Sequence, residues 1–532
     1  MTYLLHQLPF VSAMRDGDAV ALTCNDHALT YAGLAAALGR VMTGLMHLGV
    51  KRGERVAFYL DKRFETVATA FGTAAAGAVF VPVNPLLKAD QVGHILRDCN
   101  VRIIVTSAER LEAIAPTLAE CPDLRQIVVL GSTAEAEVRG KEVLAWSEFT
   151  ATAGAQGHRV IDTDMVAILY TSGSTGKPKG VVLSHRNMVA GARSVASYLE
   201  NTPADVILSA LPLSFDAGFS QLTTGFHAGA RVVLLNYLMP RDVVDAIAKE
   251  KVTGLTAVPP LWIQLSQLKW PATIGNHLRY IANTGGRMPR ETLMQLRRHL
   301  PRTQPFLMYG LTEAFRSTFL APSEIDRRPD SIGKAIPNAE ILVLRPDGTR
   351  CDTNEPGELV HRGALVGMGY WNDAEKTAER YKPLPVGVGG REAGMVLPEM
   401  AVFSGDTVRM DQEGFLYFIG RQDEMIKTSG YRVSPTEVEE ALYATGLVGE
   451  GVAFGTAHPS LGQVIVIVVT APAGGTLDAD ALLTACRKAL PAYMVPATIE
   501  VAHAPLPRNP NGKIDRRAVS VDYERRRAGA LV

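Results

Sequence analysis

Short apolar runs alternate with helical stretches between residues 55 and 282 of this 532-residue chain. The runs have the length of buried strands and lie at residues 55–60, 79–83, 101–106, 126–130, 165–169, 228–235, 254–258 and 279–282. Such alternation favours parallel strands, because each parallel connection has to cross over the sheet and usually does so as a helix. It predicts an α/β fold in which helices cover mostly parallel sheets, duplicated across two lobes.

The alternation of apolar runs with helical stretches ends near residue 340. Apolar runs at 340–344, 357–362 and 415–419 are punctuated by Pro-Asp-Gly and Asp-Gln-Glu-Gly, which predicts hairpins and a small β lobe. The sequence Gly-Arg-Gln-Asp at 420–423 marks the domain boundary. We therefore expect a large N-terminal domain over residues 1–420 and a smaller, mobile α+β domain over residues 421–532.

The C-terminal domain carries the signals of a helix start. Ser434 stands at the N-cap position, Pro435 at the first helical position and Glu437 three residues after the serine. A strand at 463–470, a helix at 478–490 and a terminal strand are expected to follow, and residues 522–532 are expected to be a short tail.

A loop after the strand at 165–169 combines glycine, hydroxyl and lysine residues. Residues 169–180 read Leu-Tyr-Thr-Ser-Gly-Ser-Thr-Gly-Lys-Pro-Lys-Gly. Glycine lets consecutive backbone N–H groups point at an anion, hydroxyls donate hydrogen bonds or ligate a phosphate-bound Mg²⁺, and lysine adds charge. Two residues, rather than the four of a Walker A loop, separate Gly173 from Gly176. So dense a run directly after a strand predicts a polyphosphate site rather than a flexible surface loop.

Four further motifs carry residue types suited to a nucleotide. They are Tyr-Gly-Leu-Thr-Glu at 309–313, Phe-Ser-Gly-Asp at 403–406, the stretch 420–432, and Asn-Pro-Asn-Gly-Lys-Ile-Asp-Arg at 509–516. An aromatic ring can stack on adenine, a glutamate can ligate Mg²⁺, and an aspartate at a strand end can accept both ribose hydroxyls. A lysine on a turn can offset the charge that builds during attack on a phosphate. Singly, each of the shorter motifs is also compatible with a plain turn.

In this order the five motifs resemble those of the adenylate-forming, AMP-binding superfamily, which includes acyl-CoA synthetases, adenylation domains of peptide synthetases and luciferases. The resemblance runs from about residue 10 to about residue 517. It implies that the C-terminal domain rotates about a hinge at Asp423, so that one site serves two half-reactions. The loop 283–289 resembles the family's adenine-side loop, although Arg287 stands where a small residue is commoner.

The resemblance also implies roles for individual residues. Catalytic roles fall to Lys513, Thr312, Glu313 and Lys427. Nucleotide or cofactor binding falls to Thr171, Ser172, Gly173, Ser174, Thr175, Gly176, Lys179, Gly285, Gly286, Tyr309, Thr312, Asp406, Arg421 and Gly430. Thr175 and Glu313 are expected to hold Mg²⁺, and Gly430 to line the tunnel for the thiol.

The implied reaction has two halves. A carboxylate attacks the α-phosphate of ATP to give an acyl-AMP and pyrophosphate, and a thiol then displaces AMP. Catalysis of such a reaction depends mainly on positioning the two anionic reactants and neutralising their charge, so no side-chain nucleophile is required. The implied cofactors are ATP, Mg²⁺ and CoA, or the phosphopantetheine of a separate carrier protein.

The sequence does not decide which carboxylic acid is activated. By resemblance, the acyl pocket draws on Asp216, Phe219, Trp262, Asn283, Gly285 and Met308. In amino-acid-activating relatives an aspartate at the place of Asp216 pairs with the substrate's ammonium, whereas fatty-acid relatives commonly have a histidine-containing motif. A buried aspartate needs a partner, which is either such an ammonium or a local backbone N–H.

Two other functions stay open as well. A stand-alone amino-acid-adenylating enzyme that loads a separate carrier protein has the same motifs, and the expected short tail leaves no room for a fused carrier domain. A non-catalytic nucleotide-binding homologue is disfavoured by the joint presence of Lys513, Glu313 and Thr175. The first 110 residues and the Phe-Asp pair at 215–216 also resemble AMP-ligases associated with bacterial exosortase systems, which does not identify the acid.

Composition bears on partners and location. Lys plus Arg and Asp plus Glu number 54 each, so no overall field attracts nucleic acid or an acidic membrane. Residues 66–87 are uncharged but contain two prolines and an asparagine, which favours a buried helix and strand over a membrane span. Five scattered cysteines without metal-ligand spacing, and no visible signal peptide, indicate a cytoplasmic protein with reduced thiols.

A local basic patch lies near the C-terminus, and we expect it to be a solvated tail, the alternative being a contact with a phosphate-bearing partner. It comprises Arg516, Arg517, Arg525, Arg526 and Arg527. The protein is expected to act on a small carboxylic acid, as a monomer or homodimer.

Overall fold

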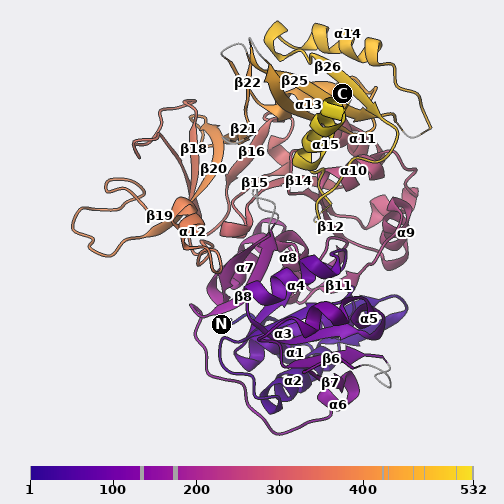
Figure 1. Cartoon of the computed structure of the whole chain (residues 1–532), viewed down its shortest axis with the longest axis vertical. Helices are drawn as coiled ribbons and strands as arrows, with labels where there is room; N and C mark the ends of the chain where they lie inside the picture. Colours follow the sequence, from indigo (N-terminus) through magenta and orange to yellow (C-terminus); the bar gives the residue numbers. More distant parts are fainter. Residues whose placement is uncertain are drawn as a thin grey trace.

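The computed structural model describes residues 2–131, 137–171, 178–421, 424–428, 431–458, 461–472, 474–510 and 512–529. In Figure 1 the first lobe, with α2, α3 and α5, lies at one end and the C-terminal elements α13, α14 and α15 lie at the other. The second lobe lies between them, and an arm that carries α12 and β19 projects to one side.

The first lobe is built on a sheet whose seven described strands run in the order β7-β6-β5-β3-β4-β8-β9. They are β3 (Arg55–Tyr59), β4 (Val79–Pro82), β5 (Val101–Ser107), β6 (Gln126–Leu130), β7 (Glu142–Ala145), β8 (Met165–Thr171) and β9 (Lys179–Ser184). Neighbours are parallel except β8 and β9, which are antiparallel. The accompanying helices are α1 (Gln7–Arg15), α2 (Tyr31–His47), α3 (Phe64–Ala76), α4 (Ala89–Asp98), α5 (Ala108–Ala119) and α6 (Trp146–Phe149). The strands predicted between residues 55 and 169 are confirmed.

The second lobe continues the predicted alternation. Its parallel strands are β1 (Val20–Cys24), β11 (Arg231–Leu234), β10 (Val206–Ser209), β12 (Gly254–Ala257), β13 (Tyr280–Asn283) and β14 (Gln304–Tyr309), with β2 (His27–Thr30) antiparallel at the edge. The helices are α7 (His185–Tyr198), α8 (Asp216–Ala228), α9 (Pro240–Glu250), α10 (Pro259–Ser266) and α11 (Arg290–His299), with short 3₁₀ turns η1 (Ala272–Asn276), η2 (Thr312–Ala314) and η3 (Pro322–Glu324). The strand predicted at 228–235 is too long, because Ala228 ends α8 and Gly229, at φ 81°, turns the chain into β11.

The predicted small β lobe is an extension of the second sheet. Its strands are β15 (Thr318–Leu320), β16 (Ser331–Ala335), β17 (Ala339–Leu344), β18 (Gly357–Gly363), β19 (Tyr381–Pro383), β20 (Met400–Met410) and β21 (Leu416–Arg421), with α12 (Ala374–Arg380). Strand β15 pairs with β14, so the antiparallel part begins before residue 340 and shares one sheet with the parallel part.

The C-terminal domain has its own sheet. Its described strands are β22 (Ile426–Thr428), β23 (Tyr431–Val433), β24 (Gly451–His458), β25 (Gly462–Thr470) and β26 (Thr498–Ala502). The helical segments are α13 (Pro435–Ala444), α14 (Ala479–Ala489), η4 (Ala492–Met494) and α15 (Arg516–Gly529). The predicted helix start at Pro435 is confirmed, but the Ser434 hydroxyl makes no capping bond.

The expected tail is instead helix α15. Val519 and Tyr523, four residues apart on one helical face, are buried against Phe454 of β24 and its neighbours. At the start of the helix, Arg516 forms ion pairs with Glu424 and Glu439. Residues 516–529 are therefore a helix rather than a tail, and Arg516 is paired. The other four arginines of the basic patch are exposed, as predicted: Arg517, Arg525, Arg526 and Arg527.

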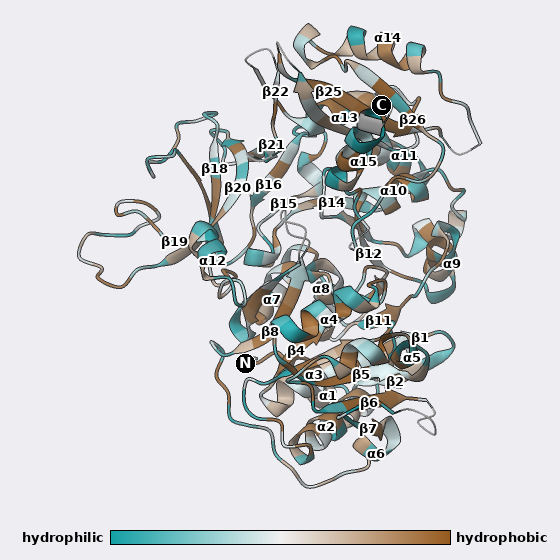
Figure 2. Cartoon of the chain, in the orientation of Figure 1, coloured by the Kyte–Doolittle hydropathy of each residue, from teal (hydrophilic) through white to brown (hydrophobic). Residues whose placement is uncertain are grey.

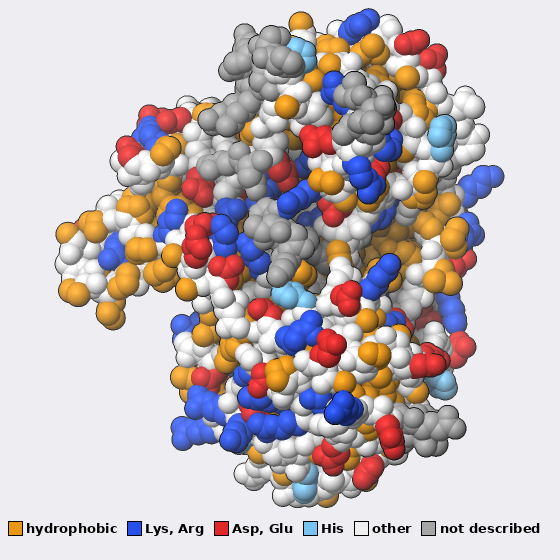
Figure 3. Space-filling model, viewed as in Figure 1, with side chains coloured by type: hydrophobic (Ala, Val, Ile, Leu, Met, Phe, Trp, Pro, Cys, Tyr) orange, Lys and Arg blue, Asp and Glu red, His pale blue; other side chains and the backbone are white. Residues whose placement is uncertain are grey.

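The distribution of apolar residues agrees with these layers. Figure 2 shows hydrophobic residues along the central strands and polar residues on the outer faces of the helices. Residues 66–87, the uncharged stretch, form most of α3 and all of β4 and are largely buried. None of the helices in the described residues is both long and apolar enough to cross a membrane. Figure 3 shows apolar side chains over the projecting arm, where Val396 and Leu397 are exposed.

Candidate functional site

The predicted phosphate loop joins the two antiparallel strands β8 and β9. Thr171, the last residue of β8, pairs with Lys179, the first residue of β9. The structure therefore shows where the loop begins and ends. Ser172, Gly173, Ser174, Thr175 and Gly176 lie outside the described residues.

Glu313 lies in η2, close to the second end of this loop. Its carboxylate Oε1 accepts a hydrogen bond of 2.5 Å from the hydroxyl of Tyr370. The Lys179 ammonium lies 5.6 Å from the centroid of the same tyrosine ring. Burial and then the charge of Glu313 raise the pKa of Tyr370, which keeps its hydroxyl a donor. Tyr370 thus connects Glu313 and Lys179, and Thr312, the neighbour of Glu313, is buried.

Asp406 lies inside the long strand β20, not at a strand end as predicted. Phe403 and Thr407 pair with residues of β18, and the three residues between them bulge out of the regular ladder. Gly405 has φ 71°, a conformation that favours glycine. The bulge brings the carboxylate of Asp406 to the site from mid-strand.

Two residues share the Asp406 carboxylate. The Tyr309 hydroxyl donates to Oδ2 at 2.5 Å, and Arg421 Nε lies 3.7 Å from Oδ1. Oδ1 is buried and accepts a hydrogen bond from no described residue. Burial raises the pKa of Asp406, whereas the charge of Arg421 and the hydrogen bond from Tyr309 lower it. A buried carboxylate oxygen of this kind suits the hydroxyl donors of a ligand.

Lys513 lies in a tight turn, directly after Gly512, whose φ is 80°. Asn509 closes the turn, since its N–H donates to the Lys513 carbonyl at 2.8 Å and its side-chain oxygen accepts from the Lys513 N–H at 3.1 Å. The lysine side chain leaves the C-terminal domain and extends into the N-terminal one, where its Nζ lies 5.6 Å from the centroid of the Phe215 ring.

The surroundings of the Lys513 ammonium combine residues from several motifs. Burial lowers its pKa, and the charges of Asp216 and Asp406 oppose that effect while Arg421 adds to it. A Cβ atom at Gly285 would lie 2.8 Å from Lys513 Cε, so any other residue there would displace the lysine side chain from this position. The structure thus brings Lys513, Gly285, Asp216, Asp406 and Arg421 to one place.

The loop after β13 closes on itself. The Asn283 side-chain amide donates to the carbonyl of Gly286 at 2.8 Å, and its buried oxygen accepts from no residue that the structure describes. Gly285, at φ 76°, provides the turn between them. This loop therefore forms the wall against which Lys513 lies.

Asp216, the first residue of α8, is buried and has two protein partners. One oxygen accepts from the Ala217 N–H at 2.7 Å, and the other lies 3.5 Å from an Nη of Arg316. Burial raises the pKa of Asp216, and the charge of Arg316 is the largest effect that lowers it. The local backbone bond that the sequence left open is thus present. Arg316, three residues after Glu313, was missed.

The acyl pocket predicted from sequence agrees only in part with the cavity beside Asp216. Phe219 and Trp262 lie in the hydrophobic core. The Phe219 ring stacks on that of Phe80 with 4.8 Å between the ring centroids, and the indole N–H of Trp262 donates to the Ala257 carbonyl at 3.1 Å. Met308 does line the cavity. The whole lining is Val195, Leu199, Ile207, Ala217, Ser220, Gln221, Thr224, Thr256, Tyr280, Met308 and Arg316.

Helical geometry explains the difference. Ala217, Ser220, Gln221 and Thr224 share one face of α8, whereas Phe219 points from another face into the core. The spacing of these small and polar residues on an otherwise apolar, buried helix is the signal that could have identified the cavity wall.

Besides Lys513, an ion pair and a hydrogen bond connect the C-terminal domain to the N-terminal domain among the described residues. The guanidinium of Arg287 pairs with Glu440 of α13 at 3.0 Å as well as with Asp330 at 2.6 Å. The Asn84 amide donates to the carbonyl of Pro510, in the Lys513 turn, at 2.6 Å. The unusual arginine of the adenine-side loop is therefore an interdomain residue.

Three predicted residues besides those of the phosphate loop cannot be placed in this way. Asp423 and Gly430 lie outside the described residues, and Lys427 belongs to β22 but its side chain is not described. Their roles, and the boundary at residue 420, stay predictions.

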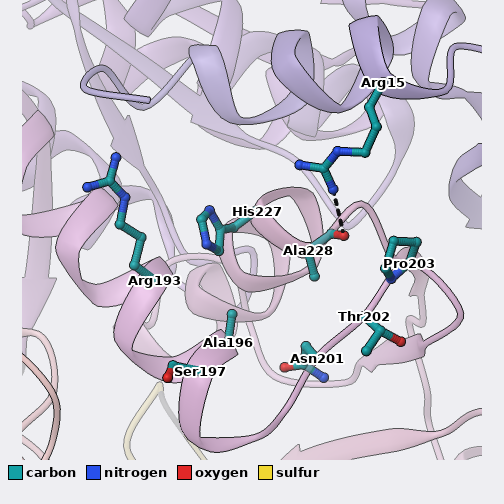
Figure 4. Close-up of a pocket in the computed structure, with 9 residues that line it drawn as sticks. All are labelled: Arg15, Arg193, Ala196, Ser197, Asn201, Thr202, Pro203, His227 and Ala228. Atoms are coloured by element: carbon teal, nitrogen blue, oxygen red, sulfur yellow. Dashed lines mark hydrogen bonds between the residues drawn. The ribbon is translucent and has the colours of Figure 1, made fainter. Parts of the chain in front are cut away.

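A larger and more open hollow lies elsewhere, at the C-terminal ends of α7 and α8. Figure 4 shows Arg15, Arg193 and His227 around it, with Arg15 bonded to the carbonyl of Ala228 at 3.2 Å. It contains none of the predicted site residues. The described part of the chain also holds no group of three or more His, Cys, Asp or Glu residues that could bind a metal.

Comparison with known proteins defines the class. The chain matches the AMP-binding enzyme family over residues 10–371 and the C-terminal domain of AMP-binding enzymes over residues 437–513. The chain therefore belongs to the AMP-binding enzyme family, and the family predicted from the five motifs is confirmed.

Individual relatives are more distant. The chain is 29% identical to feruloyl-CoA synthase of Amycolatopsis sp over 514 residues, which cover 95% of this chain and 96% of that protein. It is 29% identical to the L-proline–[L-prolyl-carrier protein] ligase of Pseudomonas fluorescens, with 98% and 99% covered. It is 30% identical to malpibaldin synthetase of Mortierella alpina over 95% of this chain, but spans only 9% of that much longer protein.

Solved structures show the same fold. The anthranilate CoA ligase in complex with anthranoyl-AMP superposes with a TM-score of 0.87 at 24% identity, covering 99% of this chain and 98% of that one. The o-succinylbenzoate CoA synthetase of Bacillus subtilis superposes with a TM-score of 0.79 at 25% identity, covering 96% of this chain and 97% of that one. The predicted fold class, a large N-terminal α/β domain followed by a smaller α+β domain, is confirmed.

Proposed function

We propose that the chain is an AMP-forming acid–thiol ligase, which activates a small carboxylic acid with ATP and then transfers the acyl group to CoA. The observation that carries the proposal is the position of Lys513. It belongs to a turn of the C-terminal domain, yet its side chain lies against Phe215 and Gly285 of the N-terminal domain. The carboxylates of Asp216 and Asp406 are near enough for their charges to act on its ammonium. A cation delivered by one domain into a carboxylate-lined site of the other suits a reaction between two anions.

The first half-reaction forms a bond between a carboxylate oxygen and the α-phosphorus and breaks the bond to pyrophosphate. Lys513 would neutralise the charge that the two reacting anions bring together. Asp406, with its open Oδ1, would accept the ribose hydroxyls, and Arg421 and Tyr309 hold that carboxylate in place. The loop 171–179 would bind the phosphates that leave.

The residues present also fit Mg²⁺. Mg²⁺ commonly uses one or two protein oxygens together with substrate phosphates. Glu313, whose carboxylate is fixed by Tyr370, would be one such ligand, and Thr175 would be the second. The ion would supply charge neutralisation to the phosphates.

For the second half-reaction, rotation about Asp423 would remove Lys513 and bring Lys427 and Gly430 to the site. The feruloyl-CoA synthase similarity supports CoA as acceptor, and the prolyl-carrier-protein ligase similarity supports a carrier protein as the alternative. The contact between Asp216 and Arg316 argues against the amino-acid-activating alternative, because Asp216 already faces a protein cation instead of awaiting a substrate ammonium.

Replacement of Lys513 by alanine tests the proposal. We expect acid-dependent exchange of pyrophosphate into ATP to fall by about 10²–10³-fold, the usual effect of removing one group that stabilises transition-state charge. Thioester formation from the isolated acyl-AMP should stay within about threefold, since that step does not use Lys513. Lys488→Ala, at an exposed lysine of α14, is the control. Exchange at the wild-type rate in Lys513→Ala would contradict the assigned role.

A further inference from the structure

Three polar atoms in the wall of the cavity beside Asp216 have no hydrogen-bond partner among the residues that the structure describes. They are Nε of Arg316, Oε1 of Gln221 and Oγ1 of Thr224, each buried and hydrogen-bonded to no residue that the structure describes. The three side chains are only 3–4% exposed. Buried polar atoms are nearly always paired, so three around one cavity indicate a group that enters it.

The orientation of Gln221 is fixed by its surroundings. Its amide nitrogen donates to the carbonyl of Leu208 at 2.7 Å and to that of Thr256 at 3.3 Å. Because both partners are acceptors, the nitrogen must face them and the oxygen must be the unpaired end. Gln221 therefore offers an acceptor at the cavity.

Arg316 offers a donor. One of its Nη atoms donates to the carbonyl of Phe315 at 3.3 Å and lies 3.5 Å from Asp216, a long contact, while Nε stays unpaired. Thr224, one helical turn after Gln221, can donate or accept. The cavity thus presents one donor, one acceptor and one hydroxyl.

Charge restricts what can bind there. Asp216 and Arg316 together are neutral, so a second carboxylate or an ammonium on the substrate would bring an uncompensated charge into a buried space. A carboxylate would also face the Gln221 oxygen, and an ammonium would face the Arg316 guanidinium. A neutral group that accepts from Arg316 and donates to Gln221 meets neither penalty.

Size is the second restriction. The space open to the centre of a water molecule is about 10 Å³, which is room for about one water-sized group. Apolar side chains form much of the remaining wall, among them Leu199, Ile207 and Met308. The far end of the acid must therefore be small.

From these observations we infer that the acid is short and ends in a neutral group that both donates and accepts hydrogen bonds, a hydroxyl or a carboxamide. Arg316, Gln221 and Thr224 recognise this group through hydrogen bonds. The inference rests on the proposed function, because it takes the cavity as the acyl site of the ligase.

The test compares short acids of equal length whose far ends are methyl, hydroxyl, carboxamide, carboxylate or ammonium. Pyrophosphate release by the full-length enzyme gives kcat/KM for each. We expect the hydroxyl or the carboxamide acid to exceed the methyl acid by at least about 10-fold, and the two charged acids to be poorer still. Thr224→Val should reduce the preference over the methyl acid about 10-fold.

Thr223→Val is the matched control on the same helix. The Thr223 hydroxyl bonds to the carbonyl of Ser220 at 3.2 Å, and this residue does not line the cavity, so its loss should leave the preference unchanged. Thr224→Val should not lower the melting temperature, because the Thr224 hydroxyl has no partner to lose in the described part of the chain. A best substrate with a methyl, carboxylate or ammonium end, or an unchanged preference in Thr224→Val, would overturn the inference while leaving the ligase assignment intact. ATP binding without pyrophosphate release for any acid would contradict the proposed function itself.

Discussion

At the scale of single residues, the hydrogen bond from Tyr370 to Glu313 has the clearest consequence for the proposed activity. It fixes one oxygen of the only acidic side chain in η2 beside the end of the phosphate loop. Hydrogen bonds to charged groups contribute about 1.5–3 kcal/mol, so the position of this carboxylate depends on the tyrosine. Residue-level motifs indicated Glu313 but not its partner, because the two lie far apart in the sequence.

Tyr370→Phe should therefore weaken the use of Mg²⁺ and ATP. We expect the concentration of Mg²⁺ that gives half-maximal pyrophosphate release to rise about 10-fold, since the carboxylate loses the donor that orients it. Tyr381→Phe is the control, because that hydroxyl bonds at 3.4 Å to the backbone carbonyl of Glu313 and not to the carboxylate. Equal Mg²⁺ dependence in wild type and Tyr370→Phe would exclude the positioning role.

At the scale of elements, the N-terminal segment is attached through a histidine that must stay neutral. The backbone N–H of Leu5 donates to Nδ1 of His185, the first residue of α7, at 3.0 Å. Burial, and then the charge of His6, lower the pKa of His185 to about 3, and burial lowers that of His6 to about 4. Protonation of Nδ1 would remove the acceptor and break the contact.

Stability should consequently fall in mild acid. Between pH 6.5, the ordinary pKa, and about pH 4 the unfolded chain binds protons at these histidines while the folded chain does not, so unfolding becomes easier as the pH falls. One histidine contributes up to about 1.4 kcal/mol per pH unit in this window. His185→Asn, whose side-chain oxygen can still accept from Leu5, should flatten the pH dependence of urea unfolding. His27→Asn, at an exposed histidine, should not, and identical slopes in both variants would contradict the account.

Elements could be predicted from the sequence where the pattern is local. The strands at 55–130 and the start of α13 follow from short apolar runs and from residue types at a helix start. Helix α15 could not be recognised in this way, because its stability depends on Val519 and Tyr523 packing against distant strands.

The residues of the candidate site likewise fall into those that could be predicted from the sequence and those that could not. The motif residues of the site could be named in advance, since each motif is a contiguous stretch with its own chemistry. Arg316, Tyr370 and the polar face of α8 could not, because their roles depend on which side chains meet after folding. Phe219 lies in the core and not in the cavity wall for the same reason, because helical rotation turns its side chain inward. Its assignment to the acyl pocket stays a prediction.

At the scale of the whole molecule, the pairing of Arg287 with Glu440 stabilises one relative position of the two domains. Both side chains are largely buried, with exposed fractions of 26% and 17%. Burial raises the pKa of Glu440, and the positive charge of Arg287 opposes this. In this arrangement Lys513 is inside the N-terminal site, which is the arrangement that the first half-reaction needs.

Glu440→Gln should shift the enzyme away from that arrangement. Loss of a partly buried ion pair worth about 1 kcal/mol should slow acid-dependent pyrophosphate exchange about fivefold. Thioester formation from isolated acyl-AMP should be unchanged or faster, because that step does not need Lys513 in place. Asp330→Asn is the matched control, since it removes the other partner of Arg287 without touching the contact between the domains. If both half-reactions slowed equally in Glu440→Gln, the ion pair would support the fold in general rather than one position of the domains.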